Sequence, residues 1–209
     1  MLFPLLLACM NPALTAPEAA AAPGTYNLNG SLYIQVYKDP TTIAAALAHD
    51  HIIQAKGWTG TATIDLEDLS TCSMDISVPV AAMAVDATPI RENLGYTTFP
   101  KDSEREDIKK EMLSENQLHG EKYKTITWKS TKCEMDGERL NMTGDLTIRG
   151  KTKTLTLPLA VKQDQVSFHV KGAAAIKATD FGFEAYSAGF GALKNQNRML
   201  LSVSVHGKP

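Results

Sequence analysis

The feature that most constrains this chain is an alternation of apolar and polar residues, which recurs with a period of two from Tyr26 almost to the C-terminus. Because successive side chains of a β-strand point to opposite faces, this alternation predicts strands with one buried and one exposed face. The expected strands cover residues 26–37, 58–66, 74–79, 125–129, 140–149, 155–161, 166–176 and 201–205.

The connections between several of these strands are too short to reverse direction except as hairpins. Asp136-Gly137, Gly150-Lys151 and Gln163-Asp164 separate consecutive strands. Such short polar and glycine-containing links enforce antiparallel neighbours. Eight antiparallel strands either stack as a sandwich or close into a barrel, and closure removes the unpaired edges. We therefore predict an all-β fold, an eight-stranded antiparallel barrel, whose interior fits side chains or one elongated ligand.

One segment, from Asp102 to Leu118, breaks the alternation. Ser103 to Glu106 has the pattern of a capping box, and Ile108 and Met112 follow at helical spacing. Gly120 is a suitable stop. The segment predicts a single amphipathic helix inserted in a long crossover between strands.

Composition excludes several classes of function. The formal net charge is −2, and Lys alternates with Glu rather than forming a basic stripe, so no nucleic-acid partner is expected. No segment after the N-terminus has the roughly 18 consecutive apolar residues of a membrane-spanning helix. The sequence contains no nucleophile elbow, phosphate-binding glycine loop, C-x-x-C pair or spaced carboxylate dyad. We therefore predict that the protein is not an enzyme.

The N-terminal segment is expected to be a targeting segment rather than part of the fold. Leu6-Leu7-Ala8-Cys9 resembles a bacterial lipobox, which would place a lipid on Cys9, although Lys and Arg are absent before it. Cleavage between Ala19 and Ala22 and an apolar tail that is not exported are the alternatives. We assign 1–24 to a signal or lipobox segment with an Ala/Pro-rich linker, and 25–209 to one β-barrel domain. The expected location is the periplasm or cell envelope, with a lipid anchor, or else secretion.

Two further cysteines, Cys72 and Cys133, lie at the ends of strands that would pair. An exported protein favours a disulfide between them. Side-chain parity argues against it, because Cys133 is out of phase with Trp128, and a bulge near Lys132 would be needed to bring both onto one face. A disulfide and two free thiols both remain open at this stage.

Four segments together resemble the YceI-like family. They are 121–131 (EKYKTITWKST), 144–153 (GDLTIRGKTK), 48–51 (AHDH), and 179–183 (TDFGF) with 191–194 (GALK). The last two are similar to a subgroup with an H-D-H turn, and the match extends over about 26–207. The resemblance implies an extended, lipocalin-like barrel with a long tunnel, in a periplasmic or secreted protein that binds polyisoprenoids such as a quinone tail.

The chain departs from the family pattern at two positions. Lys124 stands where the family usually has Pro, and Ala178 stands where many members have Arg before the Asp-Phe-Gly motif. Recognition of a ligand's head group is therefore left open by the resemblance.

The residues predicted to bind the ligand combine inward-facing strand positions, aromatic side chains and two histidines. They are His49, His51, Trp58, Ile76, Val78, Trp128, Leu146, Ile148, Phe168, Phe181, Phe183 and Tyr186. Each aromatic residue has plain core packing as its alternative role. The segment 181–190 interleaves aromatic with small residues, so we expect it to flank the tunnel mouth.

His49 and His51 are the strongest candidates for chemistry. At spacing i, i+2 on a strand, two imidazoles share one face and could bind a metal. No third ligand stands at a defined spacing, so hydrogen bonding within the protein or to a head group is the favoured role, and neither metal nor cofactor is expected. A metal-assisted enzyme, or an interaction module that passes its ligand to a membrane redox partner, is the alternative function. The expected partner is a lipid-like small molecule, and a homodimer is also considered.

Overall fold

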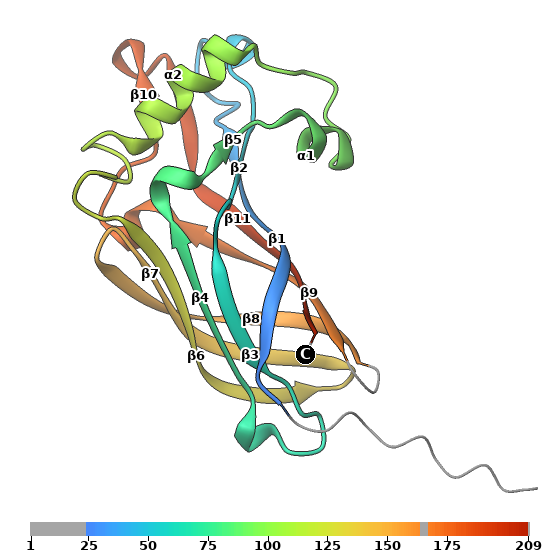
Figure 1. The fold of residues 1–209 in the computed structure, drawn as a ribbon. Coiled ribbons are helices and arrows are strands. Elements are labelled where there is room, and N and C mark those ends of the chain that lie inside the picture. The colour runs from blue at the N-terminus through green and yellow to red at the C-terminus, as the bar shows by residue number, and fades with distance from the viewer. Residues whose placement is uncertain (1–23, 164–166, 209) are drawn as a thin grey trace, which may run out of the picture.

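The protein forms a closed antiparallel β-barrel, seen in a computed structural model that describes residues 24–163 and 167–208 (Figure 1). Eight strands form the ring, because β11 pairs with β9 on one side and with β1 on the other. The ring consists of β1 (Tyr26–Lys38), β3 (Thr59–Thr63), β4 (Ser73–Pro79), β6 (Thr125–Asp136), β7 (Arg139–Ile148), β8 (Lys151–Gln163), β9 (Phe168–Lys177) and β11 (Leu193–Lys208). The predicted eight-stranded barrel is confirmed. The predicted lipid site Cys9 and its flanking segment lie outside the described residues.

Three short strands that alternation did not predict extend the sheet: β2 (His51–Gln54), β5 (Ala84–Val85) and β10 (Ser187–Ala188). β3 pairs with the first residues of β1, whereas β2 pairs with residues 33–36 of β1 and in turn carries β5. β2 and β5 therefore form a flap that continues the barrel wall beyond β3. The 3-10 turns are η1 (Ala45–Leu47), η2 (Leu69–Thr71), η3 (Val80–Ala82), η4 (Ala178–Phe181) and η5 (Gly189–Gly191).

Two helices lie at the same end of the barrel as the flap, α1 (Thr88–Asn93) and α2 (Asp102–Leu113) (Figure 1). α2 is the predicted inserted helix, but it ends at Leu113 because Ser114 is extended, five residues before the predicted end. Its cap also differs from the prediction, since the Glu104 carboxylate accepts a hydrogen bond from the backbone N–H of Lys101 at 2.6 Å. Neither helix, in the part of the chain that is described, is long and apolar enough to cross a membrane.

The opposite end of the barrel is filled by aromatic side chains. Tyr26 and Phe168 pack edge to face with ring centroids 5.6 Å apart, and Phe168 is 2% exposed. Gly207 makes room for them, because a Cβ at this position would lie 2.6 Å from the Phe168 ring. This end of the barrel is therefore packed with side chains.

A bulge in β6 accounts for the relation between the two cysteines. The register with β7 shifts between Ser130 and Lys132, which leaves Thr131 as an extra residue. An extra residue reverses the side-chain phase of the strand beyond it. Cys133 consequently faces Cys72, and the structure joins them in a disulfide with Cα atoms 6.1 Å apart. The spacing between Trp128 and Cys133 argued against this pairing, but the extra residue Thr131 brings Cys133 onto the face of Cys72.

Candidate functional site

A cavity of about 490 Å³ enters the barrel from the end covered by α2. Its wall consists of inward-facing side chains of β1, β4, β6, β7 and β11, with β2 and α2 at the mouth. A volume of this size is within the range of small-molecule sites, which are about 300–1,000 Å³. The wall is mostly aliphatic, so it favours an apolar ligand.

Of the twelve residues predicted to bind the ligand, eight line this cavity. They are His51, Ile76, Val78, Trp128, Leu146, Ile148, Phe183 and Tyr186. Trp128 lies deep in the barrel, where Gly144 on β7 gives its ring room: a Cβ there would stand 2.5 Å from the indole.

The structure places the other four predicted residues away from the cavity wall. Phe168 fills the opposite end of the barrel, and Phe181 is fully buried in η4. Trp58 precedes β3 and is half-buried against the core. His49 lies beside His51, with ring centroids 5.3 Å apart.

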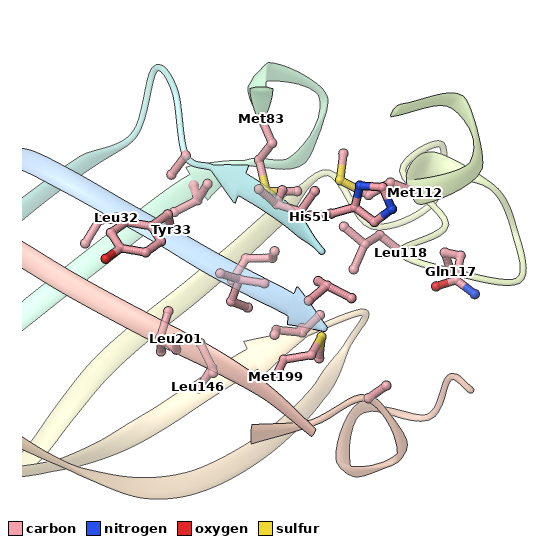
Figure 2. Close-up of a pocket in the computed structure, with 18 of the residues that line it drawn as sticks. Leu32, Tyr33, His51, Met83, Met112, Gln117, Leu118, Leu146, Met199 and Leu201 are labelled. Atoms are coloured by element: carbon pink, nitrogen blue, oxygen red, sulfur yellow. The ribbon is translucent and has the colours of Figure 1, made fainter. Parts of the chain in front are cut away.

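The roof of the cavity was not predicted from the sequence. Figure 2 shows Met112 of α2 with Gln117 and Leu118 of the following loop beside His51, and Met83 nearby. Asp107, Ile108, Glu111 and Met112 all line the cavity. These four positions share one face of α2 at spacings of three and four, which is the signal that could have identified them.

His51 is held by a carboxylate that is completely buried. Its Nδ1 lies 2.7 Å from Oδ2 of Asp86, and the backbone N–H of Ile52 donates to Oδ1 of Asp86 at 2.8 Å. Asp86 has a left-handed backbone (φ 49°), which Asp tolerates better than most residues. β2 thus holds Asp86, the residue that follows β5, through both backbone and side chain.

Arg91 of α1 neutralises this carboxylate. Its Nη1 donates to Oδ1 of Asp86 at 2.6 Å and to the carbonyl of Asp50 at 2.9 Å, while Nε donates to the carbonyl of Thr98 at 2.8 Å. The guanidinium also stacks on the Tyr96 ring, 4.6 Å from its centroid. Arg91 has no solvent exposure, so the ion pair is desolvated. The loss of any of its hydrogen-bond partners would therefore destabilise it. No sequence pattern marks either Asp86 or Arg91.

The electrostatics of the cluster fix the charge of Asp86. Burial raises the pKa of its carboxyl, but hydrogen bonds from His51, Ile52 and Arg91 outweigh burial and hold that pKa below its usual value. Burial and the neighbouring His51 lower the pKa of His49. Among the described residues, no three His, Cys, Asp or Glu side chains are grouped as a metal would require.

A second, more polar cleft adjoins the cavity and shares Glu111, Gln117 and Tyr186 with it. Arg149 lies in this cleft, where it donates to the carbonyls of Gly182 at 3.2 Å and Glu115 at 2.8 Å. Its guanidinium thereby ties the loop after α2 to the barrel rim.

Comparison with known proteins gives a consistent result over most of the chain. The model of the YceI-like domain matches residues 35–206. Protein YceI of Escherichia coli O157:H7 is 37% identical over 65 residues, which is 31% of this chain and 34% of that protein's length. The match therefore spans about a third of this curated relative.

Solved structures show the same fold at low sequence identity. BcnA of Burkholderia cenocepacia superposes with a TM-score of 0.61 at 16% identity, covering 85% of this chain and 96% of BcnA. The YCEI protein of Campylobacter jejuni gives a TM-score of 0.56 at 17% identity, covering 75% and 84%.

Proposed function

Since the chain belongs to the YceI-like family, we propose that it binds a lipid-like amphiphile with a polyisoprenoid or quinone tail, for storage or transfer in the cell envelope. The family and the barrel are consistent with a hydrophobic ligand in the interior. The tail would occupy the cavity down to Trp128, with the head group at the mouth beneath α2.

The observation that carries the proposal is the apolar cavity with one packed and one covered end. Each CH₂ group moved from water into such a cavity contributes about 0.8 kcal/mol. Immobilising the ligand and ordering side chains offset much of that gain. A tail of several isoprene units still has ample driving force, whereas a small polar metabolite has almost none.

The cover over the mouth is compatible with exchange of the ligand. α2 has no fully buried residue, although its Met112 and Leu113, with Leu118 of the following loop, pack partly against the core. Displacing α2 would therefore expose little surface that the barrel core depends on. We propose that the ligand enters by this route and that the cavity shields its tail from water during transfer.

Two adjacent leucines on β11 provide a matched test. Leu201 lines the cavity, and Leu200 next to it does not. Leu201→Trp places an indole in the cavity and is expected to weaken binding of an isoprenoid such as geranylgeraniol, whereas Leu200→Trp adds the same side chain outside it and leaves binding unchanged.

Binding can be measured with the tryptophans that the protein already has. Trp128 lines the cavity and Trp58 does not. In a Trp58→Phe background, the emission of Trp128 should change on titration with the isoprenoid. For the two leucine variants, which add a tryptophan, native mass spectrometry reports the bound ligand directly. Equal occupancy of both variants, or no isoprenoid bound by the unmodified protein, would overturn the proposal.

A further inference from the structure

From the mouth of the cavity we infer that the preferred ligand has an uncharged head group with a hydrogen-bond donor, such as a hydroxyl or an amide N–H, which Nε2 of His51 accepts. The inference rests on the proposed function, because it specifies the head of the amphiphile whose tail fills the barrel.

The first step concerns the proton on His51. Both oxygens of the Asp86 carboxylate only accept hydrogen bonds, and Oδ1 is used by Ile52 and Arg91. Oδ2 is 2.7 Å from Nδ1 of His51, so Nδ1 must carry the hydrogen. In a neutral imidazole the other nitrogen then has only its lone pair. While the ring is neutral, Nε2 is therefore an acceptor.

The second step concerns where Nε2 lies. His51 has the same strand phase as Ile53 and Ala55, and all three line the cavity. Figure 2 shows the ring beside Met112 and Leu118, at the junction of barrel and roof. Within the described residues, no hydrogen bond satisfies Nε2, and the side chain is 16% exposed. An acceptor at the entrance of an apolar cavity is suited to orient one donor on a ligand.

The third step concerns charge. Among the described residues that line the cavity, the only charged side chains are Asp107 and Glu111, both acidic and both on α2. Of the nearby arginines, Arg91 is fully buried against Asp86, and Arg149 holds two carbonyls in the adjoining cleft. An anionic head group would therefore meet two carboxylates and a lone pair, and no cation among the described residues of the lining, which disfavours acids and phosphates.

The test compares head groups on one tail, at pH 8, above the range in which histidine ordinarily titrates. The probes are geranylgeraniol, its methyl ether and geranylgeranoic acid. We expect the ether, which lacks the donor, and the acid, which is charged, each to bind about tenfold more weakly than the alcohol, the fold-change that one hydrogen bond of about 1.4 kcal/mol gives.

Two variants assign these differences to the residues named. His51→Leu should bind alcohol and ether equally, and it should keep the binding of the ether unchanged. Asp107→Asn combined with Glu111→Gln, which removes both charges from the cavity-lining face of α2 with little change of side-chain shape, should bring the acid within about threefold of the alcohol. His51→Gln, which retains an acceptor, should restore part of the preference.

The outcomes separate this inference from the function on which it rests. If none of the three probes binds, the proposed function fails. If all three bind equally, or if the acid binds most tightly, the head-group inference is overturned while the tail-binding function stands. An unchanged alcohol preference in His51→Leu overturns the role of Nε2 alone.

Discussion

Replacing Asp86 by Asn tests how much of the stability of the mouth depends on one buried charge. The side chains have nearly the same shape, and Asn tolerates the left-handed backbone of this position (φ 49°). The substitution therefore removes charge without adding backbone strain. Arg91 would then lie fully buried without its counterion.

The expected cost follows from what Arg91 retains. The carbonyls of Asp50 and Thr98 still accept its hydrogen bonds, but neither supplies a full negative charge. Breaking a buried ion pair by removing one partner costs about 3–5 kcal/mol. For Asp86→Asn we expect the lower end of this range, because the amide oxygen can still accept from the backbone of Ile52.

Equilibrium unfolding in urea measures this cost, provided that the dependence of the unfolding free energy on urea concentration is the same in both proteins. Adding Arg91→Met to the Asp86→Asn variant should recover at least about 2 kcal/mol of the lost free energy of unfolding, because the double variant buries no charge. Coupled pairs of residues deviate from additivity by this amount. Glu134→Gln is the control, because its ion pair with Lys132 is more than half exposed and is worth less than about 1 kcal/mol. A loss below 1 kcal/mol in Asp86→Asn, or additive effects of the two substitutions, would refute the reasoning.

Three other predictions use the same assay or simple variations of it. The pKa of Asp86 is lower in the folded protein than in the unfolded chain. Its contribution to stability is therefore complete above about pH 4 and is lost as the pH falls further. Unfolding midpoints measured from pH 6 to pH 2 should fall less steeply in Asp86→Asn than in the unmodified protein. Replacing Cys72 and Cys133 by Ser opens a loop closed across a separation of 61 residues and should cost about 3–4 kcal/mol, with thiol reduction of the unmodified protein giving the same shift. Gly144→Ala places a methyl 2.5 Å from the Trp128 ring, and calorimetry should show a loss of about 1–3 kcal/mol; a neutral result would mean that the ring moves freely.

The barrel could be predicted because alternation is a local signal. Each ring strand has at least five residues, long enough for period two to be visible. β2 has only four, and two apolar residues stand side by side within it: Ile52 is fully buried away from the cavity, and Ile53 lines the cavity. No alternation is visible in such a strand.

The cavity was only partly predictable, because strand phase gives the direction of a side chain but not its position along the barrel axis. Phe168 and Trp128 both point inward, yet Phe168 packs against Tyr26 at one end and Trp128 borders the cavity. The position along the axis depends on the register of all the strands around the barrel, which no single strand encodes. The bulge at Thr131 could be named from the sequence only as a condition for the disulfide, since a bulge exists only relative to the partner strand β7.

The buried ion pair holds one part of the cavity mouth more firmly than the other. A desolvated pair contributes little net stability compared with apolar side chains of the same volume, so stability alone does not account for Asp86 and Arg91. Together they tie β2, β5, α1 and the segment of Thr98 into one unit through hydrogen bonds of 2.6–2.9 Å. α2 packs against β5 at the edge of the same opening, but it has no buried residue. Hydrogen bonds are thus concentrated around His51, whereas the roof is weakly packed, so we expect a ligand that enters the barrel to displace α2 and to leave His51 in place.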